Sequence, residues 1–257
     1  MSLALVVARK EIVDHLRDRR SLLNATLLAL MGPAVVFLVS WSSRAGGENG
    51  PTVILGMLSV FALVSAFAGA IDIAMDATAG ERERKSLLPL LLNPVPPAAV
   101  IVGKWIAVTA FALAAVTLNV LGLMTVLAWR APALLATHGQ QISVWIFCGL
   151  LPLALLGGAL SVLVAVRCRT TKEAHSALTI MVFVPMIVGM FLVFFPAWVG
   201  QVWFLLPIVG QQALIGLRDQ PVPLARSVIL ALATLAAATA TLTRAVRVLS
   251  RHDVLSV

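Results

Sequence analysis

The stretch Asp76–Lys104, DATAGERERKSLLPLLLNPVPPAAVIVGK, lies between two long apolar segments and is dense in charge and proline. A charged turn (Glu81–Lys85) leads into a leucine-rich segment (Leu87–Leu92) and then a proline hinge (Pro94–Pro97). A short helix with a leucine face and charged flanks can lie across a membrane surface and insert into a groove on another protein. The alternative is a solvated connector whose charges only fix the membrane topology.

The composition identifies the class of protein. The 257 residues are 60% hydrophobic and 12% charged, with a mean hydropathy of +1.01. One soluble core cannot bury that much apolar surface, so we expect an all-α integral membrane protein with a single domain over residues 1–257. The net charge of +8 does not indicate nucleic-acid binding, because the basic residues stand at the ends of apolar runs and not in a patch with interleaved aromatics.

Six apolar runs are long enough to span a bilayer, since about 20 helical residues cover its roughly 30 Å hydrocarbon core. We place the spans at Leu22–Trp41, Thr52–Met75, Trp105–Trp129, Ile142–Val166, Ser176–Phe195 and Leu224–Thr243. Before them, residues 1–20 carry apolar side chains at helical spacing with basic residues between, which predicts an amphipathic helix at the inner interface. A polar tail is the alternative.

The basic residues predict the orientation. With the N-terminus inside, all 19 lysines and arginines are cytoplasmic except Arg44, Arg130, Arg218 and Arg226, so both termini are expected in the cytoplasm. Tryptophans such as Trp145 then fall near the outer boundary, as in an interfacial aromatic belt. The apolar but proline-broken segment 196–223 would reverse this bias if it spanned. We therefore expect a re-entrant hairpin on the outer side.

The motifs that the sequence lacks restrict the function. There is no Gly-x-x-x-x-Gly-Lys-Ser/Thr loop for ATP phosphates and no clustered His and Cys set for a metal, so we expect neither an enzyme nor a metal site. A few polar residues fall within or beside the spans, and the candidate pathway residues are Asp72, Asp76, Asn119, Gln211 and Gln212.

Each of these residues has a structural alternative. Asp72 and Asp76 stand one helical turn apart at the inner end of the second span, where they could meet a cation or form salt bridges to Arg82, Arg84 or Lys104. Asn119, in the middle of the third span, more often joins helices by hydrogen bonding than lines a pathway.

The stretch from Asp76 to Leu91, followed by Asn93-Pro-Val and Gly103-Lys104, resembles the first cytoplasmic loop of ABC-2 type permeases, particularly the NatB-like branch. The family pattern there is approximately D-x-x-A-G-E-K-E-R-G-T-L-E-P-L-L. Three other stretches are similar to the family: Arg9–Leu22, Thr171–Ser176 and Leu206–Leu214. Lys85 and Leu88 depart from the pattern, and the outer loop Ser42–Pro51 is short for the branch.

The resemblance implies the permease subunit of an ABC exporter, in a prokaryotic inner membrane, with an N-terminal elbow helix. A coupling helix within the loop at 76–104 would dock on a separate ATP-binding subunit, which holds the ATP and Mg, and a second permease chain would complete the transporter. The residues expected to couple to the ATPase are Gly80, Glu81, Glu83, Arg84, Leu87, Leu91, Lys172 and Glu173.

The substrate and two rival functions stay open. Sodium, or a small or hydrophobic compound, would fit a pathway lined by Ala, Leu, Thr and amides. A membrane scaffold that recruits a cytoplasmic partner without transport is one alternative function. An ATP-independent secondary transporter is the other, although no internal repeat of the kind such transporters carry is evident.

Overall fold

The computed structural model describes residues 2–42, 50–84, 96–195, 203–215 and 222–250, which form helices and, within these ranges, no strand. Six helical segments are long and apolar enough to cross a membrane: Arg19–Trp41, Ile54–Glu83, Pro97–Arg130, Pro132–Arg167, Thr171–Phe194 and Leu224–Ser250. The predicted all-α fold with six candidate membrane spans is confirmed.

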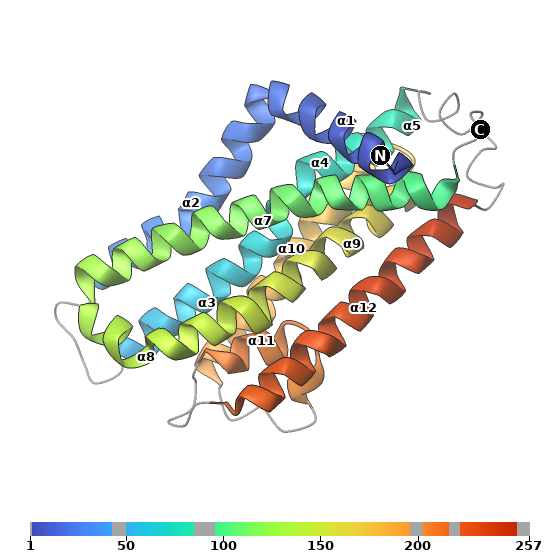
Figure 1. Ribbon diagram of the computed structural model, residues 1–257. Coiled ribbons are helices and arrows are strands. Elements are labelled where there is room, and N and C mark those ends of the chain that lie inside the picture. The colour runs from blue at the N-terminus through green and yellow to red at the C-terminus, as the bar shows by residue number, and fades with distance from the viewer. Residues whose placement is uncertain (1, 43–49, 85–95, 196–202, 216–221, 251–257) are drawn as a thin grey trace.

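The described elements are all helical. In chain order they are α1 (Leu3–Arg17), α2 (Arg19–Ser42), α3 (Gly50–Ala68), α4 (Ile71–Met75), η2 (Asp76–Gly80), α5 (Glu81–Glu83), α7 (Pro97–Arg130), α8 (Pro132–Trp145), η3 (Ile146–Leu150), α9 (Leu151–Arg167), α10 (Thr171–Phe194), η5 (Trp203–Leu205), α11 (Val209–Leu214) and α12 (Leu224–Ser250). The long helices run roughly side by side, and α1 lies across the beginning of α7 (Figure 1). We call the end that carries α1 the inner end and the opposite end the outer end.

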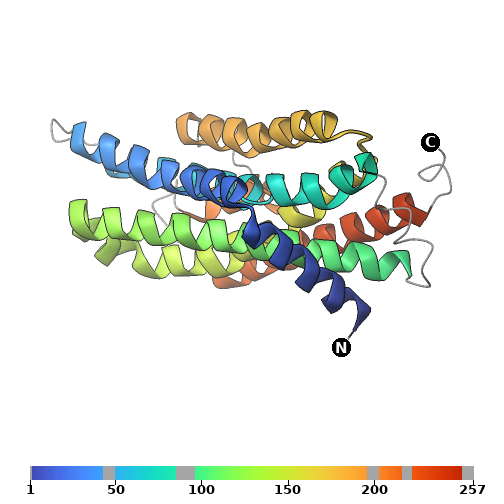
Figure 2. The same ribbon diagram turned by 90° about the horizontal axis from the view of Figure 1, so that it is seen from above.

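The helix α1 leaves the bundle at an angle to α2, as the view from above shows (Figure 2). The two helices meet at Asp18, whose extended backbone interrupts the helical path. A glycine permits the close contact of α1 with α7, because a Cβ at Gly103 would lie 2.6 Å from the carbonyl oxygen of Ala4 and 2.7 Å from the Cβ of Val7. Large side chains on the far face of α1, including Leu5 and Leu16, are exposed.

The helix of the second span is longer than the sequence predicted. It was expected to end at Met75, but it continues through a π turn, η2, and α5 as far as Glu83. The next helix, α7, begins at Pro97, where the fixed φ of proline suits the first helical turn. Both ends of the expected loop at 76–104 are therefore helical, and the leucine-rich segment 87–92 lies outside the described residues.

A proline within α2 determines how α2 packs on α7. Pro33 has no N–H, so it cannot donate to the carbonyl oxygen of Ala29 one helical turn earlier. The side-chain amide of Asn119 donates to that oxygen instead, at 2.7 Å, and both residues are buried. Such replacement of a lost backbone bond by a neighbouring helix is what allows proline inside membrane helices.

Replacing Asn119 by Ala should lower the free energy of unfolding by about 1 kcal/mol, because the Ala29 carbonyl then loses its donor inside the bundle. In Pro33→Ala the backbone N–H returns, so Asn119→Ala should be milder in that background. Unfolding of the detergent-solubilised protein would measure both effects. Thr117→Val is the matched control, because Thr117 is exposed on the same helix and bonds only to its own helix. Equal effects of Asn119→Ala in the two backgrounds would contradict the assignment.

Candidate functional site

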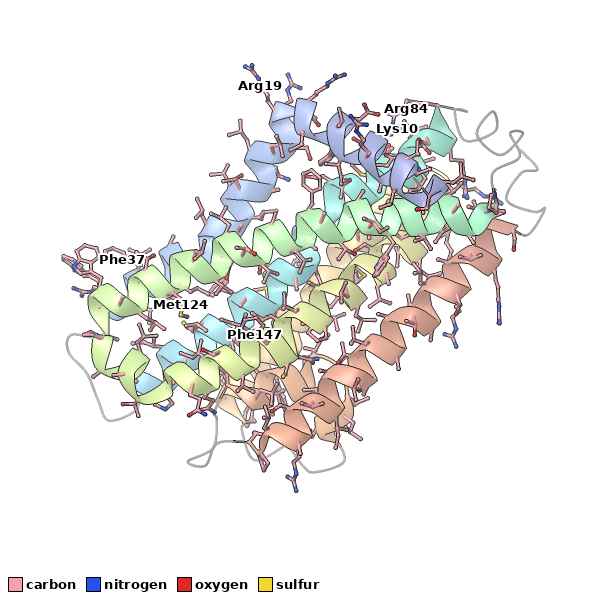
Figure 3. All side chains as sticks on the ribbon, in the orientation of Figure 1. Lys10, Arg19, Phe37, Arg84, Met124 and Phe147 are labelled. Atoms are coloured by element: carbon pink, nitrogen blue, oxygen red, sulfur yellow. The ribbon has the colours of Figure 1, made fainter. Side chains whose placement is uncertain are left out.

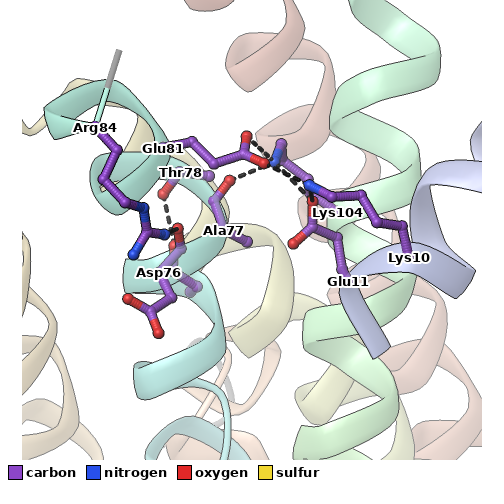
Figure 4. Close-up of polar contacts among 9 residues, drawn as sticks. Lys10, Glu11, Asp76, Ala77, Thr78, Glu81, Arg84 and Lys104 are labelled. Atoms are coloured by element: carbon purple, nitrogen blue, oxygen red, sulfur yellow. Dashed lines mark hydrogen bonds and ion pairs between the residues drawn. The ribbon is translucent and has the colours of Figure 1, made fainter. Parts of the chain in front are cut away.

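The inner end of the bundle holds a buried group of charges contributed by three elements. Lys104 of α7 is 1% exposed, and its Nζ lies 2.6 Å from Glu81 Oε2 and 3.1 Å from Glu11 Oε1. The same ammonium donates to the carbonyl oxygen of Ala77 in the π turn. Lys10 of α1 completes the group, with its Nζ 2.9 Å from Glu81 Oε1 (Figure 4). We call Lys10, Glu11, Glu81 and Lys104 the inner charged cluster.

Burial makes the arrangement of this cluster specific. A buried charge is tolerated only when opposite charges and hydrogen bonds replace the water it has lost. Lys104 has three acceptors for its three protons, so its hydrogen-bonding capacity is filled. Partial burial by itself lowers the pKa of Lys10, but its contacts with Glu81 and Glu11 outweigh this and raise it. The cluster therefore joins α1, α5 and α7 through ion pairs and hydrogen bonds.

Arg82, which follows Glu81 in α5, contacts a different element. Its guanidinium donates from Nη1 to the carbonyl oxygen of Cys168 at 2.9 Å and from Nη2 to that of Val166 at 2.7 Å. These carbonyls stand at the C-terminal end of α9, where the last backbone oxygens have no helical partner and the helix dipole favours a cation. Arg82 thus caps α9.

Glu83, the last residue of α5, binds the beginning of α10. Its Oε2 accepts hydrogen bonds from the backbone N–H of Thr171 at 2.9 Å and from the Thr171 hydroxyl at 2.8 Å. Thr170 caps the same helix by accepting from the N–H of Glu173, whose carboxylate in turn accepts from the N–H of Arg169 at 2.8 Å. The first turn of α10 is therefore held both by its own residues and by α5.

Glu81, Arg82 and Glu83 together connect four other elements. Successive residues of a helix point about 100° apart, so three in a row can reach three different neighbours. Glu81 reaches α1 and α7, Arg82 reaches α9, and Glu83 reaches α10. The two inner connections, after α5 and between α9 and α10, are consequently bound to each other at their described ends.

A cavity of about 130 Å³ lies beside the inner charged cluster. It is lined by Lys10, Glu11, Asp14, His15, Asp18, Ile73, Asp76, Ala77, Glu81 and Arg84. The His15 ring nitrogen Nε2 lies 2.6 Å from the hydroxyl oxygen of Ser21 at the junction of α1 and α2. Among the described residues, no group of three or more His, Cys, Asp or Glu is arranged to hold a metal ion.

The two aspartates of the second span do not form the salt bridges that the sequence suggested. Asp72 Oδ2 accepts from the amide of Asn24 at 3.0 Å and lies 3.5 Å from the Ser21 hydroxyl, so it holds α2. Asp76 lines the cavity, and Arg84 donates to its backbone oxygen at 3.4 Å. Within the described part of the chain, neither carboxylate pairs with Arg82, Arg84 or Lys104, because Arg82 is bound to α9 and Lys104 to the two glutamates.

The other described residues expected to couple to an ATPase lie at the same inner end. Gly80 is buried, and a Cβ there would lie 3.1 Å from the guanidinium of Arg84, which is itself exposed. Lys172 and Glu173 are exposed on the first turn of α10. Leu87 and Leu91 fall outside the described residues. The described members of the predicted set are therefore neighbours, but Glu81 has its carboxylate turned inward.

The remaining candidate pathway residues lie away from this cluster. Asn119 binds α2 mid-bundle, as described above. Gln211 and Gln212 are buried in α11 at the outer end, where the Gln211 amide donates to the Thr234 hydroxyl at 2.9 Å. Gln211 Oε1 also accepts from the N–H of Ile208, whose φ of 76° is rare for a side-chain-bearing residue. Neither side-chain polar atom of Gln212 has a hydrogen-bond partner within the described residues.

Trp145 also holds α11, which corrects a prediction. The sequence placed Trp145 in an interfacial belt, but its side chain is fully buried. Its indole N–H donates to the backbone oxygen of Gln211 at 2.8 Å. The reason is that α8, η3 and α9 form one continuous helical segment, Pro132–Arg167. Trp145 therefore lies inside the bundle against α11 and does not face its surface.

Comparison with known proteins shows the family of the chain. Residues 5–206 match the family described as ABC-2 family transporter protein. The chain belongs to the ABC-2 family. It is also similar to the ABC transporter permease protein NatB of Bacillus subtilis (strain 168), with 34% identity over 182 aligned positions; the alignment covers 66% of this chain and 46% of that protein. This ABC-2 chain therefore spans about half the length of that relative.

Sequence reasoning missed several residues of this ABC-2 site. Lys10 was counted only among the basic residues that set the topology, Arg82 was considered only as a partner of Asp72 and Asp76, and Glu11 and His15 were given no role, although each is fixed by a specific contact. The sequence did indicate that Lys104 needs a partner, because a lysine at the edge of an apolar run requires either water or an opposite charge. The identity of its partners depends on residues 93 and 23 positions away.

Replacing Lys104 by Met should destabilise the ABC-2 chain by about 3–5 kcal/mol, because two buried carboxylates then lose their shared cation. Thermal unfolding in detergent would measure the loss. The triple variant Glu11→Gln, Glu81→Gln, Lys104→Met removes all three buried charges and should recover most of the stability. Arg84→Gln is the exposed control at the same end of the bundle. A Lys104→Met protein as stable as the wild type would contradict the importance of the cluster.

The thiol of Cys168 reports on the contact between Arg82 and α9. The pKa of Cys168 is raised by burial and by the nearby Glu173 charge, while Arg82 opposes the rise. Less of the reactive thiolate is then present near neutral pH, so maleimide labelling in a Cys148→Ser background should be slow and should increase with pH above the usual thiol range.

Arg82→Gln should slow the labelling of Cys168, because it removes the positive charge that opposes the rise of the Cys168 pKa and so leaves less thiolate. Arg169→Gln removes a neighbouring positive charge without removing the cap and serves as the control. Labelling rates that are the same with and without Arg82 would show that the charge of the arginine does not act on the thiol.

Proposed function

We propose that this chain is the membrane-spanning permease subunit of an ABC exporter, driven by a separate ATP-binding subunit that holds the ATP and Mg. The observation that carries the proposal is the match of residues 5–206 to the ABC-2 transporter family. Six helices long enough to cross a membrane support it. On this proposal the chain itself hydrolyses nothing and resides in a prokaryotic inner membrane.

The inner end is proposed to be cytoplasmic. Leu249, near the end of α12, lines a small cavity with Lys104 and Arg82, so α12 ends where α1 lies. This agrees with both termini facing one side, and the concentration of basic residues at the inner end favours the cytoplasm. The exposed apolar and basic side chains of α1 suit an elbow helix on the inner surface of the membrane.

The contacts of Glu81, Arg82 and Glu83 support a role in coupling. A force applied by an ATP-binding subunit to the connection after α5 would pass through Glu83 to α10, through Arg82 to α9 and through Glu81 to α1 and α7. Because packed helices respond as rigid bodies, such a force would tilt the spans together. In this mechanism Leu87 and Leu91 dock on the ATP-binding subunit together with the exposed Arg84, Lys172 and Glu173.

Other parts of the bundle are proposed to serve a second chain and the substrate. A second permease chain, identical or related, would complete the transporter. The segment 196–223 would be re-entrant at the outer end, where the buried α11 is too short to span. Asp72, Asp76 and the amides would line the route of an exported sodium ion or of a small or hydrophobic compound.

The decisive experiment is a mild-detergent pull-down of the tagged chain from its native membranes. We expect a stoichiometric ATP-binding partner with ATPase activity. Inverted vesicles containing the complex should accumulate either radioactive sodium or a hydrophobic dye when ATP is supplied. The variant Glu83→Gln should retain the partner but transport severalfold less per ATP hydrolysed, because α10 is no longer joined to α5.

The control for Glu83→Gln is Thr243→Val, an exposed change at the inner end of α12 that removes only a hydrogen bond within its own helix. A preparation without an ATP-binding partner, under conditions that preserve other membrane complexes, would overturn the proposal. Tracer flux that persists without ATP would then favour a secondary transporter, and no flux at all a scaffold.

A further inference from the structure

The outer ends of α2 and α7 carry a cluster of aromatic rings. Phe37 stacks on Trp129 with ring centroids 5.7 Å apart and an interplanar angle of 20°, and its centroid is 6.1 Å from that of Trp41. Figure 3 labels Phe37 at this end of the molecule. Trp129 is 71% exposed and Trp41 53% exposed, so the rings form a surface that faces outward from the bundle.

Arg130 lies over this surface. Its guanidinium carbon is 5.0 Å from the Trp41 ring centroid and 6.0 Å from that of Phe37, both within the range of a cation–π contact. Within the described ranges the guanidinium makes one long hydrogen bond, from Nη2 to the Ser40 backbone oxygen at 3.4 Å. Its Nε is buried and has no hydrogen-bond partner within the described ranges.

No carboxylate of the described residues forms an ion pair with Arg130. This differs from the inner end, where the buried Lys104 has two carboxylates. A guanidinium stays charged at any physiological pH, so Arg130 requires an anion or water at its exposed donors. Its position between two exposed tryptophans at the end of two membrane-length helices is the level of the lipid headgroups.

We propose that Arg130, Trp41 and Trp129 form a binding site for the phosphate group of a membrane phospholipid at the outer end of α2 and α7. The guanidinium donates hydrogen bonds to the phosphate oxygens, while the tryptophan rings pack along the glycerol and upper acyl region. Charge complementarity and the exposed apolar side chains below, Leu38 of α2 and Leu121 of α7, favour a lipid over a free anion. This site does not depend on the transport function proposed above.

The test is native mass spectrometry of the full chain, delipidated in detergent and titrated with phosphatidylglycerol. We expect one tightly retained lipid on the wild-type protein. In Arg130→Gln the affinity of that site should fall about tenfold, the loss of one charge-assisted interaction. Arg130→Lys keeps the charge but loses the paired donors, so its affinity should be intermediate even if the glutamine variant folds poorly.

The matched control is Arg226→Gln, because Arg226 is an exposed arginine at the outer end of α12 for which no aromatic contact occurs among the described residues. Its retention of lipid should equal that of the wild type. Equal retention in Arg130→Gln, or equal losses in both variants, would overturn the proposal. Displacement of the lipid by millimolar inorganic phosphate would assign the site to a free anion. Loss of a dimer in Arg130→Gln, with lipid retained, would assign it to a second copy of the chain.

Discussion

The structure of the inner end depends on the burial of one ammonium group, that of Lys104. An unpaired charge at this depth would be strongly unfavourable, so the fold is stable only when carboxylates reach it. Glu11 approaches from α1 and Glu81 from α5, and the π turn presents the Ala77 carbonyl. Three elements must therefore meet in one arrangement. Gly103, immediately before Lys104, permits α1 to come close enough for this.

Fixing Glu81 also fixes the two residues that follow it. Once Glu81 faces Lys104, the geometry of the helix directs Arg82 toward α9 and Glu83 toward α10. The cation of Arg82 binds the C-terminal end of α9, and the anion of Glu83 binds the N-terminal end of α10. Each helix dipole favours the charge that it meets. The charged turn at the start of the inner loop thus binds the bundle internally, and any force on the connection beyond it would reach four elements at once.

The fold was predictable from the sequence to the extent that it depends on local properties. Length and hydropathy located the six spans, and the single Asn119 within an apolar run indicated a contact between helices. Its partner was not predictable, since Pro33 leaves the Ala29 carbonyl without a donor and Asn119, 90 residues after Ala29, meets that need through the register of α2 on α7. The partners of Lys104 and the burial of Trp145 were missed for the same reason, because both depend on which helices are neighbours.

Hydropathy also cannot separate helices that face lipid from helices that face protein, because lipid tails and protein interiors are equally apolar. In the segment from α8 to α9, 78% of the residues of its apolar stretch are buried, whereas in α10 only 22% are. Residue size separates them better. A Cβ on Gly157 or Gly158 of α9 would collide with α3 or α7, whereas α10 exposes Phe183 and Ile187. The glycines of α9 therefore mark the centre of this bundle, and the large exposed side chains of α10 mark a surface that lipid or a second chain must cover.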